Sequence, residues 1–196
     1  AAWVGRVSSG AIVEWSTTSP LPNSFIAPHI HRVRRYLNKV VRASSTGSLA
    51  LYTIRTRTWL YTFPAPPDAG AVTAVAQSPA IDVVAVGYAS GLVRLLDLRL
   101  DEEVMSLRME GAISALGFRA DGEPVLATAS ADGDLAVWDL NNRGRLVHLV
   151  RTAHEGGVST VEWIPGQSLL ITSGGDNAIR VGLFPRYKLP LQFTDD

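Results

Sequence analysis

The sequence has no cysteine and no long apolar run. The absence of cysteine excludes disulfide bonds and thiolate metal sites, and it fits a reducing compartment. No stretch approaches the roughly 18–20 apolar residues that a membrane-spanning helix needs, so no membrane partner is expected. The first residues, AAWVGRVSSG, have the pattern of a strand and not of a signal peptide. With 46% hydrophobic and 18% charged residues among 196, the composition is that of a folded globular chain.

Acidic residues are almost missing from the first 60 positions. This segment holds eight Lys and Arg residues and one acidic residue, Glu14, whereas the remainder holds ten basic and seventeen acidic residues. The formal net charge of the whole chain is nevertheless zero. Such asymmetry favours an anionic partner for the basic end, and the alternative is that neighbouring elements carry compensating surface charge.

Five similar segments recur along the chain at nearly constant spacing. Trp15, Tyr52, Leu96, Trp138 and Gly182 occupy the same place in them, with steps of 37, 44, 42 and 44 residues. The clearest copy is SADGDLAVWDL, in which a turn containing Asp and Gly precedes an alternating apolar strand that ends in Trp-Asp. A Trp-Asp pair on a period of about 40–45 residues is typical of the WD-repeat β-propeller, with four strands in each blade.

The predicted fold is therefore all-β, a partial WD-repeat propeller of four to five blades. A complete seven-bladed propeller needs roughly 300 residues at this period, so the chain is expected to be part of a larger protein. No segment has the pattern of a long amphipathic helix. The predicted blades span 1–24 (partial), 25–63, 71–109, 112–150 and 154–185, and 186–196 is predicted to be a connection or tail.

A buried polar network is expected within the blades. In a WD blade the Trp indole donates a hydrogen bond to a polar strand residue, which connects to a turn Asp and to a His before the blade. Trp138 would be such a donor, whereas Gly182 leaves the last repeat without one. The candidate members of this network are Ser130, Asp132, Trp138 and Asp139 in one repeat, and His154, Thr172 or Ser173, and Asp176 in the next.

No residue pattern predicts catalysis, a metal site or a cofactor. A His-Ser-Asp hydrolase triad is the alternative reading of the polar network, but the repeat already explains that spacing. Asp132 and Asp134 lack the further oxygen ligands of a calcium loop. His29 and His31 share one strand face without other zinc ligands at the usual spacing. No small-molecule substrate is predicted.

A run of basic residues is the one predicted interaction surface. Lys and Arg bind phosphates, and Tyr can stack on a base. The partner could be RNA or an acidic protein, and the alternative is a solvated loop and strand edge that discourages edge pairing. The run comprises Arg32, Arg34, Arg35, Tyr36, Lys39 and Arg42.

Several longer strings, taken in order, resemble one family of WD-repeat proteins. They are YLNK (36–39), GSL (47–49), LYTF (60–63), SPAIDVVAVG (78–87), DEEVMSLR (101–108), FRADGEPVLATAS (118–130), WDL (138–140) and DNAIR (176–180). Over residues 25–184 the chain is similar to the WD-repeat subunit of the UTP-B subcomplex of the small-subunit processome. Gly182 departs from that family, which usually has Trp at this position.

The resemblance implies a function in ribosome biogenesis. Members of this family have two tandem propellers and act in the nucleolus as non-catalytic scaffolds bound to the small nucleolar ribonucleoprotein that processes 18S pre-rRNA. The chain would then be part of the first propeller and would contact other WD-repeat subunits and pre-rRNA or small nucleolar RNA. No catalytic residue or cofactor is implied.

Two other classes of function remain open from the sequence. A WD-repeat propeller can be a general protein-interaction platform, such as the substrate receptor of a ubiquitin ligase. Those receptors often carry Arg two residues after Trp-Asp, and here Asn141 occupies that place. A propeller-based enzyme would need polar residues converging on the central channel, and the sequence indicates none.

Overall fold

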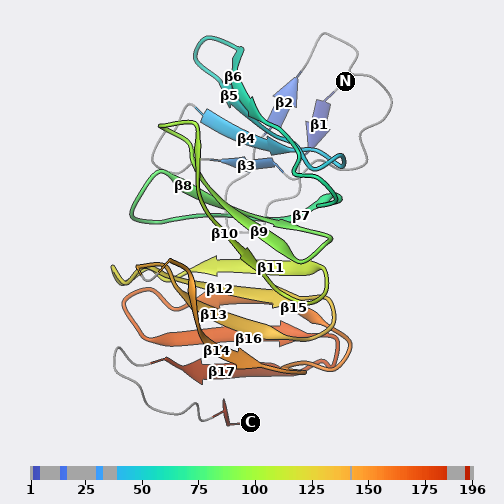
Figure 1. The fold of residues 1–196 in the computed structure, drawn as a ribbon, viewed down its shortest axis with the longest axis vertical. Coiled ribbons are helices and arrows are strands. Elements are labelled where there is room, and N and C mark those ends of the chain that lie inside the picture. The colour runs from blue at the N-terminus through green and yellow to red at the C-terminus, as the bar shows by residue number, and fades with distance from the viewer. Residues whose placement is uncertain are drawn as a thin grey trace.

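The computed structural model describes residues 2–4, 14–16, 30–32, 39–141, 143–184 and 193–194, and every regular element in them is a β-strand (Figure 1). A short pair, β1 (Ala2–Val4) and β2 (Glu14–Ser16), precedes four antiparallel four-stranded sheets. The first sheet contains β3 (Ile30–Arg32), β4 (Lys39–Ala43), β5 (Leu49–Thr53) and β6 (Thr58–Phe63). The second contains β7 (Val72–Gln77), β8 (Val83–Tyr88), β9 (Leu92–Asp97) and β10 (Glu102–Arg108).

The last two sheets repeat this plan. The third contains β11 (Ile113–Phe118), β12 (Val125–Ser130), β13 (Leu135–Asp139) and β14 (Arg145–Val150). The fourth contains β15 (Val158–Trp163), β16 (Leu169–Gly174), β17 (Ile179–Leu183) and β18 (Phe193–Thr194). In all four sheets the strands follow one another in chain order, each pairing with the next. No helix among the described residues is long and apolar enough to cross a membrane.

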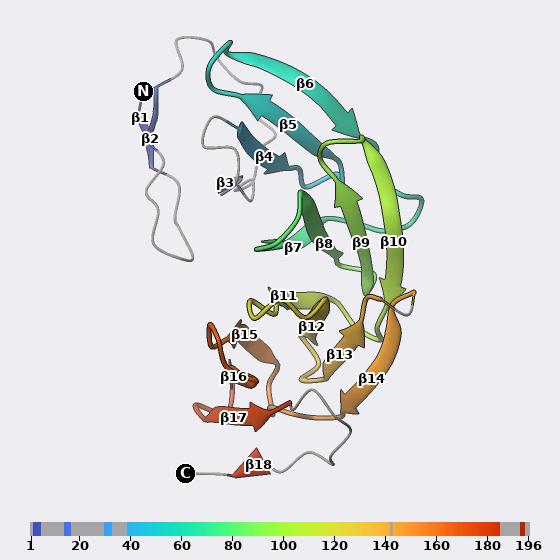
Figure 2. The same cartoon turned by 90° about the vertical axis from the view of Figure 1, so that its left-hand side faces the viewer.

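The sheets are stacked along an arc, as the blades of a propeller are (Figure 2). Strands β6, β10 and β14 follow one another along the outer side of the arc, and β7, β11 and β15 lie on its inner side. The inner strands contact one another, β11 with both β7 and β15. The all-β partial propeller predicted from the sequence is therefore confirmed.

The spacing of the repeats translates into a common register. The repeat position on the third strand of each sheet pairs with an apolar residue on the second strand. The pairs are Val40 with Tyr52, Val84 with Leu96, Leu126 with Trp138, and Leu170 with Gly182. Positions aligned by spacing alone are thus structurally equivalent in these four sheets.

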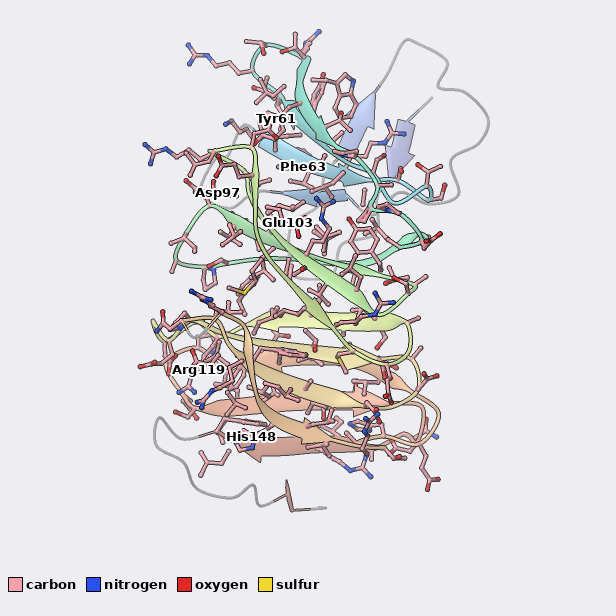
Figure 3. All side chains as sticks on the ribbon, in the orientation of Figure 1. Tyr61, Phe63, Asp97, Glu103, Arg119 and His148 are labelled. Carbon is pink, nitrogen blue, oxygen red and sulfur yellow. The ribbon has the colours of Figure 1, made fainter. Side chains whose placement is uncertain are left out.

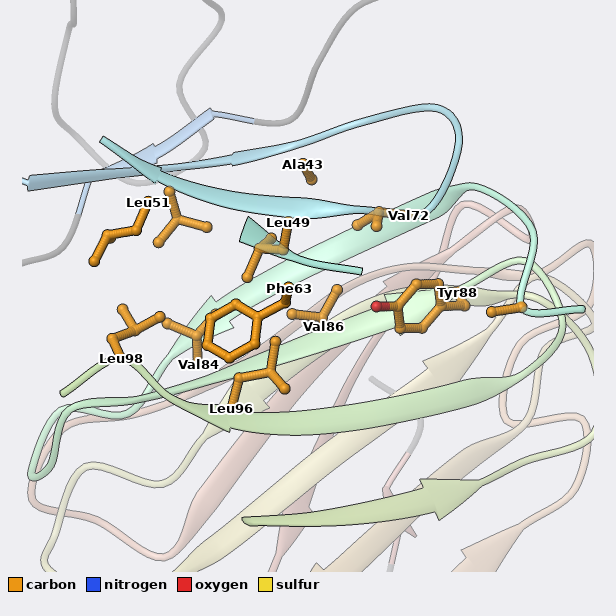
Figure 4. Close-up of a cluster of buried hydrophobic side chains, with 12 residues drawn as sticks. Ala43, Leu49, Leu51, Phe63, Val72, Val84, Val86, Tyr88, Leu96 and Leu98 are labelled. Carbon is orange, nitrogen blue, oxygen red and sulfur yellow. The ribbon is translucent and has the colours of Figure 1, made fainter. Parts of the chain in front are cut away.

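The hydrophobic core is divided into three layers, one between each two consecutive sheets. In the first layer, Leu49, Leu51 and Phe63 of one sheet pack with Val84 and Leu96 of the next (Figure 4). Strand β8 is buried along its whole length because both faces of its sheet meet a neighbour. This double burial explains why VVAVGY reads as a continuous apolar run and not as an alternating one.

A small residue faces a branched one where each inner strand approaches the preceding sheet. A Cβ atom added to Gly87 would lie 2.4 Å from Ile113 Cγ2, so only glycine fits opposite Ile113. At the equivalent register position in the third sheet is Ala129, and the shorter Val158 lies in the same core layer. The volumes of the side chains that meet are therefore matched separately at each interface between two sheets.

The two ends of the chain differ from the predicted blades in detail. Within 186–196, predicted to be a connection or tail, Phe193–Thr194 pairs with Val181 and Gly182 as a fourth strand of the last sheet. In the predicted partial blade 1–24, Glu14–Ser16 pairs with Ala2–Val4. The other residues of 1–29 and 186–196 lie outside the described residues.

We expect Gly87→Ala to lower the free energy of unfolding by about 1–3 kcal/mol, because the new methyl group overpacks the interface at Ile113. Adding Ile113→Val should recover little of that loss, because valine keeps the Cβ and Cγ2 atoms that the new methyl group would meet. Urea denaturation of the single and double variants measures both effects. Equal stability of Gly87→Ala and the parent protein would show that this contact does not limit packing.

Candidate functional site

Two hydrogen-bond clusters contain some of the residues predicted for the polar network, each on the face of a sheet that meets the preceding sheet. In the third sheet, Trp138 Nε1 donates to Thr128 Oγ1 at 2.8 Å. The Thr128 hydroxyl donates in turn to the sulfur of Met109. Thr128 is fully buried and Trp138 is 8% exposed, so these bonds satisfy polar atoms in the core.

Met109 occupies the place that a His has in the next sheet. The Met109 backbone N–H donates to Gly91 O, and the His154 backbone N–H donates to Gly133 O at the equivalent turn. Both residues precede the inner strand of their sheet and reach a threonine on the second strand. The third sheet therefore has the indole donor without the His.

The fourth sheet has the His without the indole. His154 is fully buried, with Nε2 at 2.9 Å from Thr172 Oγ1 and Nδ1 at 2.8 Å from Asp176 Oδ1. Because a carboxylate only accepts, Nδ1–H donates to Asp176 Oδ1, and a second hydrogen bond joins Nε2 to the Thr172 hydroxyl. Arg180, on β17, donates to the other oxygen of Asp176. The hydrogen bond from His154, followed by that from Arg180, lowers the pKa of Asp176 below its ordinary value.

The remaining predicted members of the network lie outside these two clusters. Ser130 Oγ accepts from the backbone N–H of Asp134 and closes the turn, so the predicted bond from Trp138 to Ser130 is wrong. Asp132 is exposed in the same turn. Asp139 Oδ1 accepts from the backbone of Asn141.

Ser173 is also separate from the His154 cluster. Its hydroxyl lies 2.7 Å from Thr160 Oγ1 in an exposed position. Of the two candidates on β16, Thr172 is therefore the residue that bonds to His154.

Thr128 and Met109 were missed by reasoning from the sequence. Thr128 and Thr172 are separated by 44 residues, the same step that relates Trp138 to Gly182. Applying this step to Thr172 would have identified Thr128 as the acceptor. The repeat spacing also relates Met109 to His154, 45 residues later, but a thioether is not a usual replacement for an imidazole, so the position alone does not predict this contact.

Among the described side chains, no group of residues is placed to hold a metal ion, and the predicted hydrolase alternative is buried. No three or more His, Asp or Glu side chains within 39–141 and 143–184 are grouped to hold a metal ion. In the hydrolase alternative, His154 would have to reach a substrate, but its ring is enclosed between the third and fourth sheets and both nitrogens have partners. This cluster serves the packing of the sheets.

A charged residue also joins the third and fourth sheets. The Arg119 side chain is nearly buried and donates to Asp121, to Ser168 Oγ and to the carbonyl of Phe184 (Figure 3). Its guanidinium lies 5.3 Å from the ring centre of Trp163. These contacts place Arg119 among the residues that stabilise the interface between the two sheets.

The structure describes only part of the predicted basic run. Arg34, Arg35 and Tyr36 lie outside the described residues, and Arg32 is described only as a backbone position of β3 opposite Val40. Their role in binding stays a prediction.

Lys39 and Arg42, the other two members of the run, lie on β4. Arg42 pairs with Ala50 and so occupies the register position of Thr128 and Thr172. Burial lowers the pKa of Arg42, and its guanidinium lies 5.7 Å from the ring centre of Trp59. Arg42 is thus half-buried on the sheet and not part of a solvated loop.

The comparisons with known proteins agree with this architecture. Residues 4–184 match the family described as the WDR36/Utp21 first β-propeller. The chain is 39% identical over 150 residues to WD repeat-containing protein 36 of Homo sapiens, covering 76% of this chain and 16% of that protein. It is 32% identical over 180 residues to the U3 small nucleolar RNA-associated protein 21 homolog of Schizosaccharomyces pombe, covering 91% of this chain and 20% of that protein.

The fold is also similar to that of solved WD-repeat structures. The structure of U3-55K matches with a TM-score of 0.68 and 21% sequence identity, covering 80% of this chain and 48% of that chain. At this identity the likeness concerns the fold alone.

We expect Trp138→Ala to lower the free energy of unfolding by about 3–5 kcal/mol, because it removes a large buried ring and leaves Thr128 without its donor. Trp138→Phe keeps most of the volume and should lie between the alanine variant and the parent. Thermal and chemical unfolding measure both. An unchanged melting temperature for Trp138→Ala would contradict the assignment of Trp138 to the core.

The Asp176 cluster should make the stability of the protein depend on pH in the acidic range. Because folding lowers the pKa of Asp176, its contribution is complete above its ordinary pKa of about 4 and is lost as the pH falls below it. Asp176→Asn should therefore lower the melting temperature at pH 7, and the difference from the parent should shrink towards pH 3. Asp132→Asn, at the equivalent exposed turn, is the matched control. A parallel loss in both variants would contradict this role.

Proposed function

Since this chain belongs to the WDR36/Utp21 first β-propeller family, we propose that it acts as a non-catalytic scaffold in ribosome biogenesis. The proposed process is assembly of the small-subunit processome and processing of 18S pre-rRNA. The observation that carries the proposal is the family match across residues 4–184, together with a relative whose name associates it with the U3 small nucleolar RNA.

The use of the polar side chains supports a scaffold over an enzyme. The groups that a hydrolase would need, His154 with Thr172 and Asp176, bond to one another between two sheets. Arg119, a nearly buried charged residue of the same interface, is likewise bonded within the chain. The polar groups in these interfaces hold the sheets together, which leaves the outer surfaces for partners.

The proposed partners are the other WD-repeat subunits of a large ribonucleoprotein and, through the basic end, pre-rRNA or small nucleolar RNA. Six basic or aromatic residues were predicted for this contact, and they remain the proposed contact: Arg32, Arg34, Arg35, Tyr36, Lys39 and Arg42. The proposed location is the nucleolus, where such an assembly would form.

The chain accounts for a small part of its relatives, 16% and 20% of the lengths of the two compared. We propose that 1–24, 25–63, 71–109, 112–150 and 154–185 are successive blades of one incomplete propeller. Contacts made by the whole protein would then be shared between this propeller and the rest of the molecule.

We expect a tagged full-length protein to co-purify processome subunits, pre-rRNA and U3 small nucleolar RNA, and its depletion to lower mature 18S rRNA. Quantitative mass spectrometry and RNA sequencing of the purified material measure the first, and northern blotting measures the second. An unrelated nucleolar WD-repeat protein is the control for nonspecific recovery. Recovery of a cullin adaptor without processome subunits would overturn the proposal in favour of a ubiquitin-ligase substrate receptor.

A further inference from the structure

The first sheet differs from the other three in charge. Residues 39–67 contain Lys39, Arg42, Arg55 and Arg57 and no acidic residue. In each of 71–110, 112–150 and 151–184, acidic residues outnumber Lys and Arg. An anionic partner would therefore be attracted to the first sheet and repelled by the surfaces that follow it.

The hairpin between β5 and β6 places two of these arginines in solvent. Residues 54–57 are all exposed, and Arg57 has a φ of 57°. The same left-handed position is occupied by Asp101 and Arg143 in the two following hairpins, with φ values of 59° and 54°. The backbone conformation of the turn is thus the same in these three repeats. Of the three, only the first hairpin carries Arg at the positions of both Arg55 and Arg57.

The turn is followed by an exposed tryptophan on β6. Trp59 is 51% exposed, and Leu146, at the equivalent position opposite Trp138 in the third sheet, is 42% exposed although that sheet packs between two others. The Trp59 ring meets the Tyr52 ring edge to face, with centroids 4.9 Å apart. The Arg42 guanidinium lies 5.7 Å from the Trp59 ring centre. Two neighbours therefore hold the ring while about half of the residue remains open to solvent.

These features match the recognition of single-stranded nucleic acid, which combines positive charge along the backbone with aromatic rings on which bases stack. Double-stranded RNA is recognised mainly through its shape, without such stacking. An acidic protein would satisfy the arginines but would make no particular use of an exposed indole. Single-stranded RNA is the partner that uses both the charge and the ring.

We propose that the β5–β6 hairpin is a contact site for single-stranded RNA, in which Trp59 stacks on a base while Arg55 and Arg57 contact neighbouring phosphates. The site adds three residues to the basic run predicted from the sequence and places the contact on the first described sheet. It rests on the proposed function, because it names the part of this propeller that would meet the RNA of the assembly.

The test is fluorescence anisotropy with the full-length protein and a labelled single-stranded oligouridine. Trp59→Ala should weaken binding by about 10-fold, and Trp59→Phe should restore most of it because a ring remains for stacking. Arg55→Gln with Arg57→Gln should lower the slope of log affinity against log salt by about 1.4, as expected for two lost phosphate contacts to a single strand. Arg143→Gln, at the equivalent turn of the third sheet, is the matched control and should leave affinity unchanged.

Two results would overturn the hairpin site. One is unchanged affinity in both the Trp59→Ala and the double arginine variant, provided that circular dichroism shows them folded. The other is the absence of RNA binding by the parent protein. Co-purification of processome subunits with the same variants separates these failures from failure of the proposed function, because the proposed scaffold requires that association whether or not the hairpin binds RNA.

Discussion

The structure depends on the burial of both faces of its sheets. Strand β8 has no exposed residue, since one face of its sheet packs on the first sheet and the other on the third. A four-stranded sheet of this composition would expose an apolar face if it lost either neighbour, and such a face would not be stable in water. Stability is therefore a property of consecutive sheets in contact, as in other repeat proteins.

Burial on both faces also determines where polar side chains are allowed. Thr128, Trp138 and Met109 form a chain of donors and acceptors on one interface, and Thr172, His154 and Asp176 form another on the next. In the second sheet the corresponding positions are the apolar Val86 and Leu96, which need no partner. An interface can accommodate a polar group wherever a neighbouring atom completes its hydrogen bond, whether that atom is a sulfur or an imidazole nitrogen. This freedom allows the repeats to diverge while the register stays constant.

The sequence predicted the elements that depend on periodicity. The steps between Tyr52, Leu96, Trp138 and Gly182 predicted both the sheets and their register, because each blade must present the same face to its neighbour. It did not predict partners that depend on three-dimensional proximity. Ser130 and Thr128 are both buried hydroxyls on one strand, and they differ only in which one lies beside the indole. Likewise, Trp59 is exposed on the outer strand β6 and Trp163 is buried on the inner strand β15, a difference that composition alone does not predict.

The three described hairpins that lead to the outer strands show which features of the turn folding requires and which can vary. Arg57, Asp101 and Arg143 adopt nearly the same left-handed backbone, although none of them is glycine and their charges differ. A turn that tolerates either sign of charge at this position does not need a particular one for its conformation. The arginines of the first hairpin are therefore not explained by folding, whereas Arg119, bonded on several sides within the chain, is. These arginines lie on one sheet beside an exposed aromatic ring. Binding to a partner accounts for them, whereas folding does not.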